Sequence, residues 1–318
     1  MKLARYVGGG QVEIRDEPAP DCPEGGILIR TIASGLCSGE LMDWYMEQKI
    51  PHVLGHEICG QVIESQSEEF PVGSLVAPHH HANCGKCDWC KSGREVHCPQ
   101  WKATKLNPGG MAEFVAVPEK NLLDTHLVDH LRPQDAALME PLACVAKSIR
   151  VSGVSRRDSS VAVVGLGTMG LMHCLALGCP GIEISEARRN WAESVGVSAV
   201  APSGNKTYDA LFCCPGTQQA MEWCVSWLNP GGKLIMFSPL PPAEKLSLSS
   251  SQIYFNEIQV IPSYSCGRQD MLQAKSWLES GVLKADQIVS DFIRLDELPS
   301  AYGKMKAGEI VKAMVMFD

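Results

Sequence analysis

The spacing of apolar and polar residues divides the chain near residue 145. Before that point, short β-like runs are separated by Gly, Pro and Asp. Such runs are typical of a twisted antiparallel or barrel-like β domain. The runs that we expect to be strands cover residues 26–31, 60–64, 74–77 and 112–117.

Beyond residue 145, strand-like runs alternate with helix-like segments. We expect strands at residues 160–164, 182–184, 210–214, 233–237 and 258–263, and helices at 169–177, 186–195 and 218–228. Asn-Pro-Gly-Gly at 229–232 predicts a turn before one of these strands. The alternation predicts an α/β unit with a doubly wound parallel sheet. The tail adds expected helices at 269–280 and 297–307 and a last strand at 311–317.

One stretch, residues 159–182, contains no Asp, Glu, Lys or Arg and is long enough to suggest a membrane span. It also contains five glycines and Pro180. A buried strand, a glycine-rich loop and a helix explain it better, so we expect no contact with a membrane.

The glycine-rich loop in this stretch has the pattern G-x-G-x-x-G. The first glycine makes a tight turn, the second lets the backbone approach a pyrophosphate, and the third lets helix and strand pack closely. The N-terminus of the following helix then binds the anion. We therefore predict a dinucleotide site that includes Gly165, Gly167, Thr168, Met169 and Gly170.

The nicotinamide cofactor is predicted to be NAD. An acidic residue about twenty positions into such a unit binds the ribose hydroxyls and repels a 2′-phosphate. Glu183 is the expected residue, and Glu186 competes with it. Arg188 and Arg189 lie close by and keep NADP open as the alternative, and Arg188 is included among the expected cofactor contacts.

Composition narrows the class of protein. The chain has 318 residues, enough for about two domains, and 45% of them are apolar. A net charge of −8 without a basic stripe argues against a nucleic-acid partner. Residues 1–13 lack the apolar core of an export signal, so we expect a cytoplasmic protein. In that compartment the fourteen cysteines indicate metal binding or catalysis rather than disulfides.

Four cysteines form the pattern C-x2-C-x2-C-x7-C. Thiolates at these short spacings can reach one tetrahedral centre, and four of them leave no open position. The pattern therefore predicts a structural zinc site in a lobe that spans residues 79–98, while an iron–sulfur cluster stays an alternative. The four expected ligands are Cys84, Cys87, Cys90 and Cys98. The adjacent His79, His80 and His81 favour an exposed or cleft-lining loop over metal ligation.

A second metal constellation is scattered along the sequence. Cys37, His56 and Glu140 supply one thiolate, one imidazole and one carboxylate. Three ligands leave a fourth position open, where an alcohol or water binds. Glu57 adjoins His56 and is expected either to orient it or to serve as an alternate ligand.

Together these residues resemble the zinc-dependent medium-chain alcohol and polyol dehydrogenases over nearly the whole chain. Glu140 stands where sorbitol-dehydrogenase-like members carry Glu, so the resemblance favours the sorbitol, threonine and butanediol dehydrogenase branch. The motifs that carry the resemblance are Gly35-Leu36-Cys37, Gly55-His56-Glu57, the cysteine lobe, residues 109–114, Glu140-Pro141-Leu142-Ala143-Cys144, the glycine-rich loop and Pro230-Gly231-Gly232.

The resemblance implies two domains and a homo-oligomer. A GroES-like, β-rich catalytic domain would comprise residues 1–145 and 266–318, and a Rossmann domain would comprise 146–265. It implies two zinc ions per chain and a homodimer or homotetramer. The family usually has a hydroxyl two residues after the metal-binding Cys to relay protons. Here that position is Gly39, and Ser38 comes one residue earlier.

The predicted function is hydride transfer between a secondary alcohol or polyol and NAD. The catalytic residues would be Cys37, Ser38, His56, Glu57 and Glu140. One alternative is an NADPH-dependent carbonyl reductase on the same scaffold. The other is a non-catalytic protein that binds zinc and nucleotide, because fold does not guarantee function.

Overall fold

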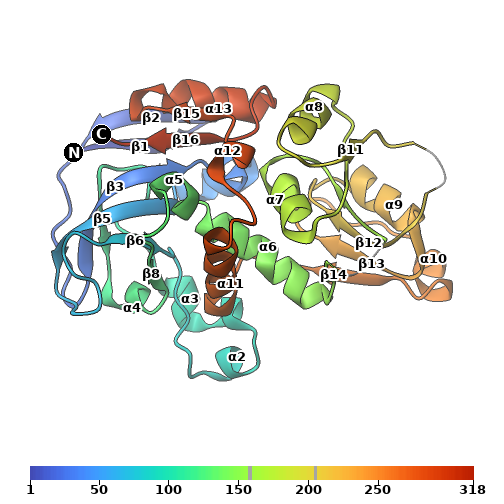
Figure 1. The fold of residues 1–318 in the computed structure, drawn as a ribbon, viewed down its shortest axis with the longest axis horizontal. Helices are drawn as coiled ribbons and strands as arrows, with labels where there is room; N and C mark the ends of the chain where they lie inside the picture. The colour runs from blue at the N-terminus through green and yellow to red at the C-terminus, as the bar shows by residue number, and fades with distance from the viewer. Residues whose placement is uncertain (157–159, 204–205) are drawn as a thin grey trace. The chain divides into compact units, whose positions relative to one another are not determined.

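The computed structural model describes residues 1–156, 160–203 and 206–318. These residues form two compact units (Figure 1). Unit 1 comprises Met1–Ala143 and Cys266–Asp318, and unit 2 comprises Cys144–Ser265. Ser159, the first residue of the uncharged stretch, lies outside the described residues. No helix within the described ranges is long and apolar enough to cross a membrane.

Unit 1 is built on two β-sheets. The larger sheet has the order β15-β16-β3-β5-β6-β8, with β7 also paired to β3, and the smaller has the order β2-β1-β4. All pairs are antiparallel except β15 with β16. The strands are β1 (Lys2–Gly8), β2 (Gln11–Asp16), β3 (Ile27–Gly35), β4 (His52–Val53), β5 (Glu57–Ser65), β6 (Leu75–Pro78), β7 (Phe114–Val117), β8 (Thr125–Leu127), β15 (Asp291–Ile293) and β16 (Ala313–Met316).

The helices of unit 1 are mostly single turns. Two longer ones, α11 (Arg268–Glu279) and α13 (Leu298–Ala307), come from the C-terminal part of the chain. The short ones are α1 (Asp43–Met46), α2 (Asp88–Lys91), α3 (Pro99–Ala103), α4 (Glu119–Leu122), α5 (Pro133–Ala136) and α12 (Ala285–Ile288), with 3-10 turns η1 (Ser38–Leu41), η2 (Glu47–Lys49), η3 (Glu95–His97) and η4 (Leu295–Glu297).

Register in the larger sheet brings three distant segments together. The last residue of β3, Gly35, pairs with Glu57 at the start of β5 and with Met314 of β16. Residues just after β3, just before β5 and just before β16 therefore meet at one end of the sheet. Apolar side chains such as Ile29, Ile58 and Val115 are fully buried in the core beneath.

Unit 2 is a six-stranded parallel sheet of order β11-β10-β9-β12-β13-β14. In sequence order this is 3-2-1-4-5-6, the arrangement of a doubly wound dinucleotide-binding fold. The predicted α/β class, with a β-rich domain and a Rossmann unit, is confirmed. The strands are β9 (Val161–Val164), β10 (Gly181–Ile182), β11 (Ala199–Val200), β12 (Tyr208–Cys213), β13 (Leu228–Met236) and β14 (Gln259–Pro262). The helices are α7 (Thr168–Leu177), α8 (Glu186–Ser194), α9 (Gln218–Ser226) and α10 (Ser250–Phe255), and α6 (Met139–Ser152) begins in unit 1 and continues into unit 2.

One expected turn lies inside a strand instead. Asn-Pro-Gly-Gly at 229–232 is part of β13. The pairing moves from Tyr208–Leu228 to Ala210–Lys233, so β13 carries extra residues opposite β12. Gly231 has a φ of +77°, which a glycine adopts at little cost. The motif therefore makes an irregularity within the strand, because pairing resumes beyond it.

Candidate active site and metal centres

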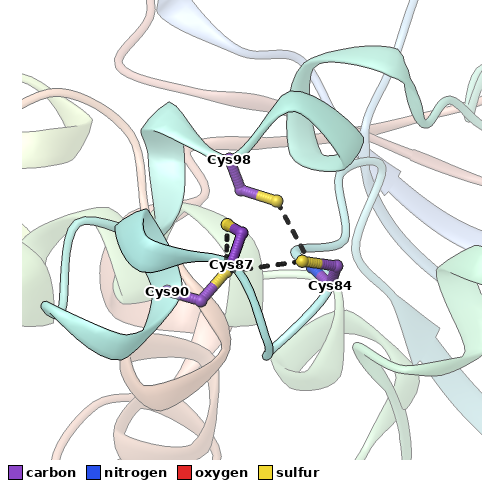
Figure 2. A group of neighbouring side chains, drawn as sticks. All are labelled: Cys84, Cys87, Cys90 and Cys98. Carbon is purple, nitrogen blue, oxygen red and sulfur yellow. Dashed lines mark hydrogen bonds between the residues drawn. The ribbon is translucent and has the colours of Figure 1, made fainter.

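The cysteine lobe brings its four sulfurs to one point. The Sγ atoms of Cys84, Cys87, Cys90 and Cys98 all lie within 4.8 Å of one another (Figure 2). The Sγ atoms of Cys87 and Cys90 are 3.5 Å apart, and those of Cys84 and Cys90 are 4.0 Å apart. A Zn–S bond of about 2.3 Å places tetrahedral sulfurs roughly 3.8 Å from one another. The four residues therefore fit a closed tetrathiolate site.

Backbone amides favour the charged form of one of these thiols. The N–H groups of Lys86 and Cys87 lower the pKa of Cys84 to about 6. Burial raises the pKa of Cys90 to about 12. A thiolate is the form that binds a metal, so the lobe presents one ready ligand, and a cation would favour ionisation of the rest.

A second group of donors gathers at the end of the larger sheet. Cys37 follows β3, and His56 and Glu57 stand where β5 begins. Their ligand atoms all lie within 4.8 Å of one another. Cys37 Sγ also accepts a hydrogen bond from the N–H of Gly39, at 3.3 Å. One thiolate, one imidazole and one carboxylate can hold zinc and leave a fourth position for another ligand.

Glu40 orients the imidazole of this group. Its Oε1 lies 3.4 Å from Nδ1 of His56 and accepts the N–H of Gly55 at 2.8 Å. Burial lowers the pKa of His56, but Cys37 and Glu40 together raise it well above its usual value. A carboxylate on one ring nitrogen directs the other toward a metal. Glu40 was not among the predicted site residues, and its sequence signal is its position three residues after the candidate ligand Cys37.

In unit 2, the glycine-rich loop has the geometry that phosphate binding needs. Gly165 has a φ of +85° and follows β9 directly. A Cβ on Gly170 would lie 1.8 Å from the carbonyl oxygen of Gly165, so the third glycine permits close packing. A Cβ on Gly167 would meet nothing within 4 Å, which leaves this backbone accessible to a ligand. Thr168 and Met169 open α7, with Thr168 buried.

Comparisons with known proteins find similar chains. The family model for the alcohol dehydrogenase GroES-like domain matches residues 23–126. The D-altritol 5-dehydrogenase of Agrobacterium fabrum is 28% identical, with 94% of each chain covered. The sorbitol dehydrogenase of Bacillus subtilis is 25% identical, with 99% of this chain and 97% of the relative covered.

A solved structure gives the same result for the whole fold. A Sinorhizobium meliloti protein, assigned as a zinc-binding dehydrogenase and bound to NADP, is 26% identical and superposes with a TM-score of 0.86 over 99% of both chains. Over nearly its whole length, this chain is similar to zinc-dependent alcohol and polyol dehydrogenases. It is an oxidoreductase of the alcohol and polyol dehydrogenase type.

In this dehydrogenase, Glu183 binds the glycine-rich loop itself. Its buried carboxylate accepts the N–H groups of Leu166 and Ser185, each at 2.8 Å. Arg189 donates to the backbone carbonyls of Glu183 and Ile184, so its guanidinium is engaged beside the strand end. Arg188 is half-buried in the first turn of α8, and its N–H donates to the Ser185 hydroxyl.

Glu140 lies in a different group from the one expected. The structure groups Glu57, rather than Glu140, with Cys37 and His56. Glu140 instead gathers with His79 and Cys266, and all three are buried. Burial raises the pKa of Glu140, and His56 opposes that shift. His79 is fully buried, unlike the exposed or cleft-lining loop that its neighbours suggest. Ser38 is half-buried at the start of η1.

The dehydrogenase also contains a buried lysine, Lys312, that was not among the predicted site residues. Nζ of Lys312 lies 2.5 Å from Oε2 of Glu57 and donates to the carbonyl of Leu36 at 3.0 Å. Lys312 has no exposed surface. A buried ammonium requires a paired anion, and here that anion is a candidate metal ligand. The only sequence signal is a single lysine in an otherwise apolar run.

Proposed function

We propose that this chain oxidises a secondary alcohol or polyol by transferring hydride to NAD at a zinc site. Cys37, His56 and Glu57 would hold the ion. The observation that carries the proposal is their convergence at one sheet end, with ligand atoms within 4.8 Å. When bound, zinc acidifies an alcohol and the nicotinamide accepts the hydride.

The residues of this chain have distinct tasks in the proposed reaction. Glu40 holds His56 in the orientation that a ligand needs, and Lys312 holds Glu57. Ser38, or an ordered water on Glu57, carries the proton away from the substrate hydroxyl. Glu140, which the sequence placed in this ligand set, would contribute its charge from beside His56.

The cofactor site would use the glycine-rich loop for the pyrophosphate and Glu183 for the ribose hydroxyls. Gly165, Gly167, Thr168, Met169 and Gly170 line this turn, and Arg188 would contact the adenosine side. The carboxylate of Glu183 favours NAD because it would repel a 2′-phosphate. The cysteine lobe would hold a second zinc with a structural role.

The proposal also covers the oligomeric state, the compartment and the domains of the enzyme. We propose a homodimer or homotetramer in the cytoplasm, with residues 1–145 and 266–318 as the catalytic domain and 146–265 as the cofactor domain. Tyr254 and Phe255 are 76% and 80% exposed in α10. They lie just before β14, an edge strand of the sheet. An apolar surface of this kind favours association.

The test is a screen of initial rates with purified chain. Polyols, threonine, diols and simple secondary alcohols are each offered with NAD and with NADP. We expect turnover with at least one of them, faster with NAD, and its loss after zinc is removed by a chelator. Faster reduction of the matching carbonyl with NADPH would favour the reductase alternative. Tight binding of zinc and NAD without any turnover would favour the non-catalytic alternative.

A further inference from the structure

We propose that His79, Glu140 and Cys266 form a third metal site, which takes Zn²⁺ independently of the cysteine lobe and of the Cys37 group. Their ligand atoms all lie within 4.8 Å of one another. His79 and Cys266 have no exposed surface, and Glu140 is 7% exposed. The inference goes beyond the proposed reaction, which needs no ion at this place.

The distance between the first two donors suits one metal ion. Sγ of Cys266 lies 3.6 Å from Nε2 of His79. With Zn–S near 2.3 Å and Zn–N near 2.0 Å, tetrahedral ligands are separated by roughly 3.5 Å. Imidazole, thiolate and carboxylate together are a ligand set that zinc accepts.

The imidazole is oriented as it would be in a metal site. Nδ1 of His79 lies 2.7 Å from Oδ2 of Asp124, whose other oxygen lies 2.9 Å from Nε2 of His126. Asn121 donates to the carbonyl of His79 at 3.0 Å. Since Nδ1–H donates to Asp124, Nε2 presents its lone pair toward Cys266. Histidine ligands are held in this way by a carboxylate on the opposite nitrogen. Glu40 and His56 repeat the arrangement in the Cys37 group.

Two features of the backbone position Cys266. The carbonyl of Cys266 accepts the indole N–H of Trp101 at 3.1 Å. Cys266 also comes just before Gly267, the N-cap of the twelve-residue helix α11. Amides at a helix N-terminus stabilise a thiolate.

The position of the site in the chain suggests its role. The chain passes from unit 1 into unit 2 after Ala143 and returns to unit 1 at Cys266. Glu140 is three residues before the departure, and Cys266 is the first residue after the return. An ion bound by Glu140, Cys266 and His79, which directly follows β6, would link the two connections between the units to the larger sheet. We therefore assign it a structural role.

The experiment measures zinc per chain in the full-length protein by elemental mass spectrometry. We expect three ions in the parent, two in Cys266→Ala and two in His79→Gln. The matched control is Cys59→Ala, which removes a buried thiol from β5 and should keep all three. An unchanged zinc content in a folded Cys266→Ala variant would overturn the proposal.

A double variant separates this inference from the proposed function. Cys37→Ala should remove one zinc, and Cys37→Ala with Cys266→Ala should remove two. If Cys37→Ala kept its full zinc and activity while Cys266→Ala lost an ion, the proposed function would fail and this site would stand.

If Cys266→Ala does not fold, Asp124→Asn provides the test. This change keeps every proposed ligand and removes the carboxylate that orients His79. Such changes typically weaken metal binding by about 10- to 100-fold. We expect that loss for one of three ions in competition with a chelator. Unchanged affinity of all ions would contradict the site.

Discussion

The cysteine lobe and the Cys37 group bring their potential metal ligands together in different ways. The lobe takes all four ligands from residues 84–98, a single looping segment. The Cys37 group takes its ligands from the end of β3 and the start of β5, and its support from Lys312 before β16. One site is therefore a local structure, whereas the other is a product of sheet register.

The two sites also differ in how their charges are balanced. In the lobe, the N–H groups of Lys86 and Cys87 stabilise Cys84, and neighbouring sulfurs complete the group. In the Cys37 group, the carboxylates of Glu40 and Glu57 are buried and paired with His56 and Lys312. We infer that changes to the lobe affect local folding, while changes to the Cys37 group affect chemistry with the fold retained.

The largest effect is expected in the lobe. Cys90→Ala opens the tetrathiolate set and should cost much of the metal-linked folding free energy, on the order of 10 kcal/mol in small zinc domains. The readouts are zinc content and the rate of limited proteolysis within residues 84–98. A Cys90→Ala variant that kept its zinc and its protease resistance would contradict a structural site. Cys22→Ala, a half-buried thiol outside the lobe, is the control.

The second-largest effect is expected on the catalytic rate when the Cys37 group is changed, with the fold retained. Cys37→Ala should lower the alcohol-dependent rate of NADH formation by at least about 1,000-fold, because Lewis-acid catalysis is worth several kcal/mol and 1.36 kcal/mol is a factor of ten. Circular dichroism should show an intact fold. Cys59→Ala should retain the rate. Equal rates in Cys37→Ala and parent would disprove the zinc mechanism.

The third effect is a loss of stability when the buried ion pair between Lys312 and Glu57 is broken. In the metal-free protein, Lys312→Met leaves the Glu57 carboxylate buried without its partner, which costs about 3 kcal/mol of unfolding free energy, measured by urea denaturation. Adding Glu57→Gln should recover part of that loss. Lys306→Met, which breaks an exposed pair with Asp43, should cost under about 1 kcal/mol. A Lys312→Met loss no larger than this control would mean that the pair contributes little.

The smallest effect is expected in unit 2, which contains neither metal group. Burial lowers the pKa of His173 to about 4, while Ser148 and Met169 bind its two nitrogens. The unfolded imidazole, with a pKa near 6.5, takes up protons first, so stability falls as pH drops from 6.5 toward 4. Between pH 7 and 5 the loss is about 2 kcal/mol.

His173→Gln should flatten this pH dependence in thermal unfolding, and the same change at exposed His130 should not. A slope that persisted in His173→Gln would assign the acid sensitivity to the metal groups instead. The result therefore separates imidazole protonation from loss of metal, which acid also causes.

The sequence predicted local features of the structure but not contacts between distant segments. The strand, loop and helix around Gly165 were predicted nearly to the residue, because each step is set by neighbours in the chain. The cysteine spacing likewise foretold a cluster. The roles assigned to these residues stay predictions.

Contacts between distant segments were not predicted. Glu57 was expected to orient His56 or to serve as an alternate ligand, but nothing indicated its partner Lys312, which is 255 positions away. Likewise, no pattern linked Cys266 to His79, which is 187 positions away. A single sequence carries no sign of such contacts, because a strand pairing fixes them only after the sheet forms. The turn expected before a strand at 229–232 was wrong, because these residues form an irregularity inside β13.

The sequence separation between Glu57 and Lys312 determines how long after Glu57 its partner is synthesised. At about 5 to 20 residues per second, a ribosome needs roughly 13 to 50 seconds to extend the chain from Glu57 to Lys312, which is 255 positions further on. All four thiols of the cysteine lobe have been translated long before then. The nascent chain can therefore load its first metal during synthesis, whereas the Cys37 group gains its lysine only when the last strand has emerged.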